Sequence, residues 1–391
     1  IVIGAVGFYR LFINGKDITK GFLAPYISNP DDIVYYDRYD VSSLINEGEN
    51  IIAVLLGNGL QNNPGGAIWD FDKAPWRGAP SFALRLNMTD SDGNTTAIES
   101  DESFKVCDSP ILFDDYRCGE YYDARLEISD FHTADFDDSG FKNAVNTSAP
   151  RGEKRLCTAD PVRIYGELKP VSVTRAENGW LYDFGENNTG VCRLSVNAKA
   201  GQKITLRYGE WLKDGKLCLD NIRFAQQSDL QKDFVQKSEY ICKDGNQTHT
   251  PSFIYNGFRY VLAEGITEEQ ANANLLTYLK ISSLPDCAGE FACSDEVINK
   301  IQEAAVRSDI SNFNYFPTDC PQREKNGWTA DASLSAEQML LNLYPEKCYK
   351  EWMRSIYKAL NDNGQLPGII PTGGWGYHWG NGPAWDNVII N

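Results

Sequence analysis

Three acidic side chains, an arginine and a tryptophan occur together in TDCPQREKNGWTADA, residues 318–332. If the middle of this stretch is helical, Glu324, Trp328 and Asp331 lie at i, i+4 and i+7 on one face, and Asp319 lies just before it. Clustered carboxylates repel one another and lose hydration in a core, but acid/base work on a glycosidic bond requires them. One carboxyl protonates the leaving oxygen, its neighbours hold sugar hydroxyls, and the indole forms an apolar platform. The pattern is compatible with a carbohydrate-processing site.

The same spacing also fits an ordinary helix start, because the first turn of a helix is commonly acidic. In that interpretation Asp319 caps the helix, Glu324 lies on a solvated face beside Lys325, Asp331 caps the next helix, and Trp328 belongs to the core. Spacing alone leaves both interpretations open.

Composition and charge narrow the class of protein and of partner. The 391 residues are too many for one hydrophobic core and predict two to three domains. An apolar content of 42% with 23% charged residues predicts a folded, soluble protein, and no apolar run reaches the roughly 18 residues of a membrane span. The net charge of −17 disfavours nucleic acid and anionic membranes as partners, which leaves a neutral ligand as the expectation.

The number and spacing of cysteines and histidines bear on the cellular compartment of the protein and on whether it binds a metal ion. The ten cysteines include no CxxC pair, and Cys192 and Cys242 occupy strand-like positions where a free thiol packs as a small hydrophobe. We therefore predict reduced thiols and a cytoplasmic location. Only three histidines occur, so we predict neither a metal site nor a cofactor. The chain opens inside a strand-like run without Met, so we expect both ends to be truncated and leave a signal peptide open.

The first two thirds of the chain have the pattern of β-structure. From residue 1 to about 155, β-branched and aromatic runs are broken by turn residues about every eight to twelve positions, as in a β-sandwich. Asn14-Gly15 in FINGKDI predicts a tight hairpin turn. From about 160 to 265, alternation such as that of residues 192–196 and 204–208 predicts half-buried strands of a second sandwich.

Helical periodicity begins near residue 290. We predict one helix capped by Ser294, one starting near residue 321, one over 331–342, and one entered near Pro345 and stopped by Asn363-Gly364. Strands followed by helices imply separate domains, which we place at 1–157, 158–288 and 289–391. A few helices with apolar faces do not form a stable domain by themselves. We therefore expect the helical domain to continue beyond Asn391.

Several long segments resemble one enzyme family. DCPQREKNGWTADA resembles the signature Asp-Cys-Pro-x-Arg-Glu-x-x-Gly-Trp-x-Gly-Asp-Ala of the bacterial-type α-L-rhamnosidases, glycoside hydrolase family 78, with Ala330 in place of a glycine. Further segments are similar to the family in the same order: GFYRLFINGKDI, YYDRYDVSSLINEGENIIAVLLGNG, GEYYDAR, YDFGENNTGVCRLSV, LRYGEWLKDGKL, FIYNGFRYVLAEG and FACSDEVINKI. The resemblance implies a multidomain β + α fold: two antiparallel β-sandwiches followed by the N-terminal part of an (α/α)6 barrel.

The resemblance also implies residue roles. It makes Glu324 the general acid of an inverting, exo-acting α-L-rhamnosidase that releases terminal α-L-rhamnose. Asp319 and Asp331 are implied to bind the rhamnose hydroxyls with Arg323 nearby, and Trp328 is implied to stack on the sugar. The general base of the family is a glutamate farther downstream than this chain reaches.

Two further regions complete the expected site. Glu337 falls at the wrong place in the pattern to replace the base, and we interpret it as a helix-surface residue. The glycine-rich segment GIIPTGGWGYHWGNGPAWD corresponds to a loop that lines the family's sugar pocket, which suggests Trp385 and Asp386 as substrate-binding residues beside Trp375 and Trp379. A tryptophan cluster that only stabilises a long loop is the alternative.

Two other functions stay open. The chain could be an inactive fragment that binds carbohydrate through its β-sandwiches, since it lacks the downstream base. It could also belong to a glycosidase of the same architecture that acts on another α-linked sugar. In each case the expected partner is a carbohydrate, and a homodimer is compatible with the sequence.

Overall fold

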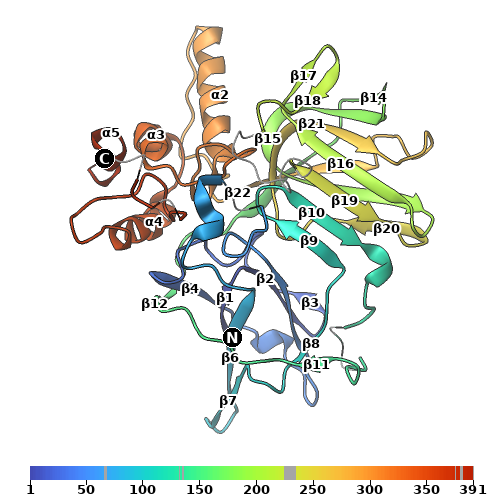
Figure 1. The fold of residues 1–391 in the computed structure, drawn as a ribbon, viewed down its shortest axis with the longest axis vertical. Coiled ribbons are helices and arrows are strands. Elements are labelled where there is room, and N and C mark those ends of the chain that lie inside the picture. The colour runs from blue at the N-terminus through green and yellow to red at the C-terminus, as the bar shows by residue number, and fades with distance from the viewer. Residues whose placement is uncertain are drawn as a thin grey trace.

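The computed structural model describes residues 1–65, 68–131, 133, 136–223, 235–374, 376–378 and 382–390. Figure 1 shows two β-rich units and a helical unit that contains the C-terminal end of the chain. The first β unit lies at the bottom of this view, the second at the upper right, and the helices at the upper left. Strands followed by helices are the predicted order. Among the described residues, none of the helices combines the length and apolar character needed to cross a bilayer.

The first β unit contains a five-stranded sheet in the order β12-β4-β1-β6-β7 and a three-stranded sheet in the order β3-β2-β5. Apolar side chains from both sheets share one core, which includes Ile3, Leu11 and Leu84. The pairings are antiparallel except for β12, which runs parallel to β4. The strands of this unit are β1 (Val2–Val6), β2 (Phe8–Ile13), β3 (Lys16–Asp17), β4 (Ile33–Arg38), β5 (Ile52–Gly57), β6 (Ser81–Thr89), β7 (Thr95–Glu99), β8 (Lys105–Val106), β11 (Lys142–Asn143) and β12 (Glu153–Leu156).

The predicted hairpin at Asn14-Gly15 is confirmed. Strands β2 and β3 pair across it, with Phe12 opposite Asp17. Asn14 and Gly15 have φ angles of 47° and 82°, which is the left-handed region that this dipeptide tolerates at a tight turn.

The second β unit is built on a ten-stranded sheet whose main path is β13-β22-β15-β21-β16-β19-β10-β9. The predicted alternation is confirmed, because Cys192, Leu194 and Val196 are buried while Arg193 and Ser195 are not. Its strands are β9 (Ile111–Asp115), β10 (Gly119–Asp123), β13 (Arg163–Leu168), β14 (Ser172–Ala176), β15 (Gly179–Ala198), β16 (Lys203–Gly209), β19 (Lys237–Ile241), β20 (Gly245–His249), β21 (Asn256–Glu264) and β22 (Leu276–Ser282), with β17 (Trp211–Lys213) and β18 (Lys216–Cys218) as a separate hairpin.

The β9–β10 hairpin connects the two β units. Its residues 111–123 precede β12 in sequence, yet β10 pairs in parallel with β19 of the ten-stranded sheet. The turn of this hairpin, residues 116–118, also contacts the first β unit, because the Tyr116 ring lies 5.9 Å from the ring of Phe8 in β2.

The helical unit contains α2 (Glu296–Ser311), α3 (Thr329–Asn342), α4 (Glu346–Lys358) and the single turn α5 (Pro383–Asp386), with a short hairpin of β23 (Phe313–Asn314) and β24 (Phe316–Pro317). The predicted helix starts near 294, 331 and 345 are confirmed within a few residues, but α4 ends at Lys358, before the predicted stop at Asn363-Gly364. The N-cap of α2 is Asp295 rather than Ser294, because the Asp295 carboxylate accepts from the backbone N–H groups of Val297 and Ile298.

One side of α2 and α3 is apolar and open. Their exposed apolar residues include Val297, Ile298, Ile301, Leu334, Leu340 and Leu341. Leu334 is 87% exposed and Leu341 is 72% exposed. Amphipathic helices normally bury such a stripe against a neighbour.

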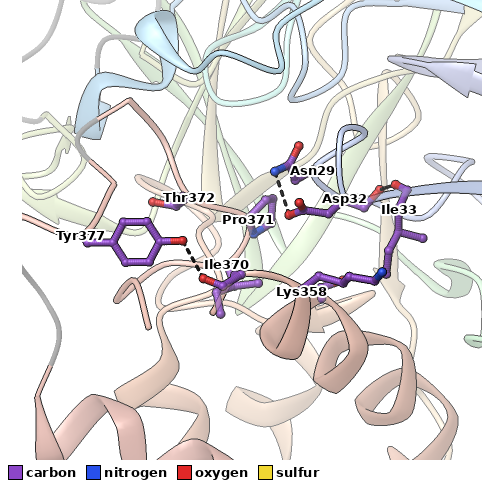
Figure 2. Close-up of a pocket in the computed structure, with 11 residues that line it drawn as sticks. Asn29, Asp32, Ile33, Lys358, Ile370, Pro371, Thr372 and Tyr377 are labelled. Atoms are coloured by element: carbon purple, nitrogen blue, oxygen red, sulfur yellow. Dashed lines mark hydrogen bonds between the residues drawn. The ribbon is translucent and has the colours of Figure 1, made fainter. Parts of the chain in front are cut away.

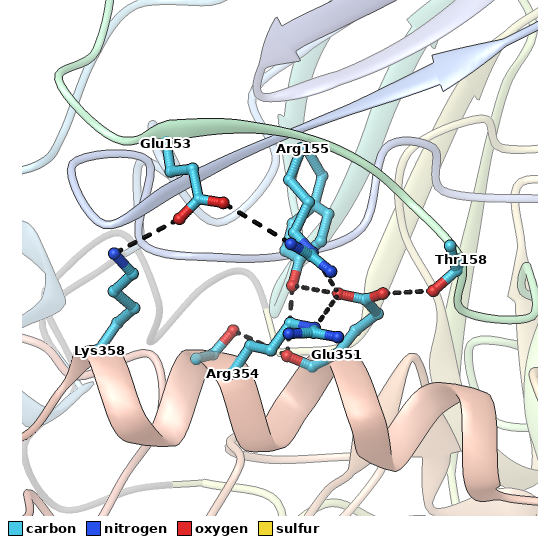
Figure 3. Close-up of polar contacts among 8 residues, drawn as sticks. Glu153, Arg155, Thr158, Glu351, Arg354 and Lys358 are labelled. Carbon is cyan, nitrogen blue, oxygen red and sulfur yellow. Dashed lines mark hydrogen bonds and ion pairs between the residues drawn. The ribbon is translucent and has the colours of Figure 1, made fainter.

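A polar network joins α4 to the first β unit and the linker that follows it (Figure 3). The Glu351 carboxylate, 1% exposed, accepts from Tyr35 Oη at 3.0 Å, from Arg155 Nε at 3.2 Å and from the Thr158 hydroxyl. Arg354 Nε lies 3.5 Å from the same carboxylate. Each Glu351 oxygen thus has a donor, so this buried charge is compensated across the unit boundary.

Candidate active site

The helix predicted to begin near residue 321 does not form there. Pro321–Glu324 form a turn, and α3 begins only at Thr329, with Trp328 as its N-cap. Lys325 has a φ of 57°, which no right-handed helix allows. The side chain of Asp319 accepts from the backbone N–H of Asn326 at 2.9 Å and closes the segment into a loop. We call residues 318–328 the Glu324 loop.

The predicted side chains nevertheless converge. Trp328 Nε1 donates to Glu324 Oε2 at 2.9 Å. Glu324 is 5% exposed and Trp328 is 7% exposed, so the middle of the cluster is buried. The interpretation that puts Glu324 and Lys325 on a solvated face is wrong, since Lys325 is also buried. Core packing, the alternative considered for Trp328, does describe its ring, which belongs to the main apolar cluster.

Two aspartates add charge to the cluster. Burial, followed by the nearby Glu324 carboxylate, raises the pKa of Asp319 to about 7. Asp331 lies in the first turn of α3 at an exposed position, and desolvation and Glu324 raise its pKa as well. The three carboxyl groups therefore influence one another electrostatically, which is typical of acid/base sites.

Arg323 is at the open side of the cluster. Its Nη2 lies 3.5 Å from Glu324 Oε1, and its side chain is 38% exposed. Together with the exposed Asp331, it is the part of the cluster that solvent reaches most easily. Glu324 and Trp328 are thus covered by neighbouring residues, whereas Arg323 and Asp331 are accessible to solvent.

The site has a member from the first β unit that sequence reasoning missed. Trp69 Nε1 donates to Glu324 Oε2 at 2.6 Å, and the Trp69 and Trp328 rings meet edge to face at 5.4 Å. The only sequence signal is the aromatic content of IWDFDKAPW, a loop segment between β5 and β6. That local signal does not indicate the contact with Glu324, which lies 255 positions farther along the sequence.

Arg117, in the turn of the β9–β10 hairpin, was also missed. Its Nε donates to the backbone oxygen of Glu324 at 2.8 Å, and its Nη2 donates to Asn326 Oδ1 at 2.5 Å. The guanidinium lies 4.6 Å from the centre of the Phe71 ring. Arg117 therefore contacts both the Glu324 loop and the segment that carries Trp69.

Lys325 anchors the loop from within. Its Nζ donates to the backbone oxygens of Tyr116 at 2.9 Å and Tyr255 at 2.5 Å, and it lies 4.5 Å from the centre of the Tyr255 ring. Burial lowers the pKa of Lys325 to about 7. The two carbonyls come from the β9–β10 hairpin and from the loop before β21, so one side chain ties the site to both.

Trp385 and Asp386 lie in α5, which packs on α3. Trp385 packs against the apolar cluster that contains Trp328, and Asp386 Oδ1 is buried without a hydrogen bond to any other described residue. They border the same helix as the Glu324 loop. Trp375 and Trp379 lie outside the described residues. Glu337 is exposed on α3, as predicted.

A cavity of about 100 Å³ lies elsewhere, between the first β unit and the end of α4 (Figure 2). Asn29 and Asp32 from the β unit, Lys358 from α4, and Thr372 and Tyr377 from the following loop line it, and the Glu324 loop does not. Within the described part of the chain, no group of three or more His, Cys, Asp or Glu side chains is arranged to hold a metal ion.

Comparisons with known proteins give one consistent result. Residues 1–166 match the α-L-rhamnosidase N-terminal domain, residues 173–282 the bacterial α-L-rhamnosidase concanavalin-like domain, and residues 286–391 the bacterial α-L-rhamnosidase 6 hairpin glycosidase domain. A curated α-L-rhamnosidase of Formosa agariphila is 30% identical over 387 residues, which is 95% of this chain and 40% of that protein.

Two solved structures are similar over almost the whole chain. The α-L-rhamnosidase of Dictyoglumus thermophilum superposes with a TM-score of 0.89 at 32% identity, over 100% of this chain and 42% of that one. The Streptomyces avermitilis α-L-rhamnosidase complexed with L-rhamnose gives a TM-score of 0.90 at 27% identity, over 99% and 37%. The chain therefore spans about 40% of the length of the relatives it matches.

Proposed function

Because the chain belongs to the bacterial-type α-L-rhamnosidase family, glycoside hydrolase family 78, we propose that the complete protein hydrolyses terminal α-L-rhamnosides. The observation that carries the proposal is the convergence of Trp69, Trp328 and Arg323 on the Glu324 carboxylate, with the Asp319 carboxyl nearby. Protonation of a leaving oxygen requires a carboxyl held in a fixed position, and neighbouring carboxyls favour its protonated form.

In the proposed mechanism, Glu324 is the general acid. It donates its proton to the glycosidic oxygen as the bond to the anomeric carbon breaks. A glutamate outside residues 1–391 activates water on the opposite face of the sugar, roughly 6.5–9.5 Å from Glu324, so that the configuration inverts. No metal or organic cofactor takes part.

The proposed substrate contacts follow the same cluster. Asp319 and Asp331 accept from rhamnose hydroxyls, with Arg323 beside them, and Trp385 and Asp386 border the pocket. Stacking of the sugar on Trp328 stays a prediction, and its buried ring supports a second role in fixing Glu324. The buried Asp386 Oδ1, which lacks a hydrogen bond among the described residues, supports a ligand-facing role for that side chain.

We propose that residues 1–157 and 158–288 form two sandwiches, with β9 and β10 of the first range joining the sheet of the second, and that residues 289–391 begin an (α/α)6 barrel. The open apolar faces of α2 and α3 support further helices packing on them. All ten cysteines are free, which supports a reducing, cytoplasmic location. A homodimer stays a prediction that light scattering of the complete protein can test.

Expression of the complete protein and release of nitrophenol from nitrophenyl α-L-rhamnopyranoside tests the activity. NMR of the first product formed tests inversion, because β-L-rhamnose must appear before mutarotation. A panel of nitrophenyl glycosides tests the substrate: a clear preference for mannoside or glucuronide contradicts the proposal. Binding of rhamnosides without turnover supports the carbohydrate-binding alternative.

A further inference from the structure

We propose that Trp69 is a positioning residue that keeps Glu324 Oε2 as the accepting oxygen, so that Oε1 carries the proton given to the glycosidic oxygen. The inference rests on the proposed function and adds to it an atom and a residue from the first β unit. The same contact makes the first β unit part of the catalytic arrangement.

The assignment follows from the two indoles. An indole N–H can only donate, and both Trp69 Nε1 and Trp328 Nε1 donate to Oε2, at 2.6 and 2.9 Å. In a protonated carboxyl group, the carbonyl oxygen accepts and the hydroxyl oxygen carries the proton. Two fixed donors at Oε2 therefore favour the proton on Oε1.

The surroundings of Oε1 fit the release of that proton. When the Oε1–H bond breaks and the proton bonds to the departing glycosidic oxygen, negative charge remains on Glu324. Arg323 Nη2, 3.5 Å from Oε1, and the indole donors at Oε2 then stabilise the charge on both oxygens. The water that attacks the anomeric carbon gives its proton to the general base.

The position of Trp69 is fixed by its own backbone. Trp69 and Asp70 both have φ near 54°, which is rare for a side chain as bulky as tryptophan. The backbone N–H of Gly374 donates to the oxygen of Asp70 at 2.7 Å. A Cβ at position 373 would lie 2.3 Å from the Trp69 oxygen, so the glycine permits this approach. Such a conformation persists only where neighbouring contacts hold it.

Trp69→Phe in the complete enzyme tests the proposal, because it keeps the ring and removes the N–H. The matched control is Trp76→Phe: Trp76 is buried in the same loop, and its Nε1 donates to the backbone oxygen of Thr372 at 3.1 Å instead of to Glu324. We expect Trp69→Phe to lower kcat roughly 10- to 100-fold with KM within about threefold. We expect the basic limb of its pH–rate profile to move up by about one pH unit, because the carboxyl loses a donor that favours its charged form.

Trp76→Phe should leave the basic limb in place, whatever it does to Tm. If Trp69→Phe also leaves the limb in place, or lowers activity only in proportion to a loss of folded protein, Trp69 has no positioning role and the inference is overturned. The parent enzyme separates this failure from that of the proposed function: an inactive parent contradicts the function, whereas an active parent with an unshifted variant contradicts only the inference.

Discussion

Glu324 and Glu351 are both buried glutamates of the helical unit that make hydrogen bonds to the first β unit. Glu351 has donors on both oxygens and two arginines beside it (Figure 3). Glu324 has two neutral indole donors on one oxygen and a half-exposed arginine 3.5 Å from the other. The difference separates a glutamate whose contacts join two units of the molecule from one that we propose to act as the general acid.

Replacing Glu324 should have the largest effect on activity. We expect Glu324→Gln in the complete enzyme to lower kcat by roughly 10²- to 10⁴-fold and to abolish the basic limb, because the amide cannot act as an acid. The side-chain oxygen of the glutamine can still accept from the two indoles, so Tm should stay within a few degrees of the parent. The control is Glu337→Gln on the exposed face of α3, which should leave both quantities unchanged. Activity of Glu324→Gln within a few-fold of the parent would remove Glu324 from the role of acid.

The reverse pattern is expected at Glu351. Glu351→Gln keeps the volume but removes the charge that faces Arg155 and Arg354, and it turns an amide N–H toward existing donors. We expect a loss of stability of about 2 kcal/mol, less than for a fully buried pair because Arg155 is partly exposed. Thermal unfolding should show a lower Tm, while kcat of the remaining folded enzyme changes less than twofold. A large fall in kcat with unchanged Tm would erase the distinction between the two glutamates.

Lys325 tests whether the Glu324 loop depends on anchors outside the helical unit. Lys325→Met fills a similar volume but leaves the carbonyls of Tyr116 and Tyr255 without this donor. We expect kcat to fall about tenfold and Tm to drop by several degrees, because unpaired buried carbonyls are costly and the loop shifts. Steady-state kinetics and thermal unfolding measure both effects. An unchanged kcat despite a lower Tm would show that the loop holds its shape without the lysine.

Local sequence patterns predicted the elements whose shape depends on near neighbours. The Asn14-Gly15 turn, the alternation around Leu194 and the helix after Pro345 all follow from short-range periodicity and turn chemistry. The β9–β10 hairpin does not, because its pairing with β19 joins residues more than a hundred positions apart.

The site shows the same division. The residue types around Glu324 led to the proposed chemistry, which stays a prediction. The predicted helix at 321 was wrong because the left-handed Lys325 is fixed by carbonyls of Tyr116 and Tyr255. Tertiary contacts overrode local propensity there. The contact between Glu324 and Trp328 was predicted from a helix that does not form, and the aromatic content around Trp69 gave no indication of its contact with Glu324.

Asp319 gives the smallest and most specific test of the coupling at the site. Its folded pKa is raised to about 7, mainly by burial and then by Glu324, so the folded protein binds one more proton than the unfolded chain between about pH 4 and pH 7. Its contribution to stability is therefore present below about pH 4 and is lost as the pH rises through 7. Asp319→Asn removes this loss, because the amide does not ionise and can still accept from the Asn326 N–H.

We expect the Tm difference between Asp319→Asn and the parent to increase by about 3 °C in favour of the variant from pH 5 to pH 8. We also expect the activity of the variant toward rhamnosides to fall. Asp114 is the control, because burial also raises its pKa to about 7 and its side chain binds Asn58, away from Glu324. Asp114→Asn should show a similar pH effect on Tm with unchanged activity. If both variants show the pH effect on Tm and both keep activity, Asp319 is a buried structural acid like Asp114. Asp319 then has no part in substrate binding or in the chemistry proposed for Glu324.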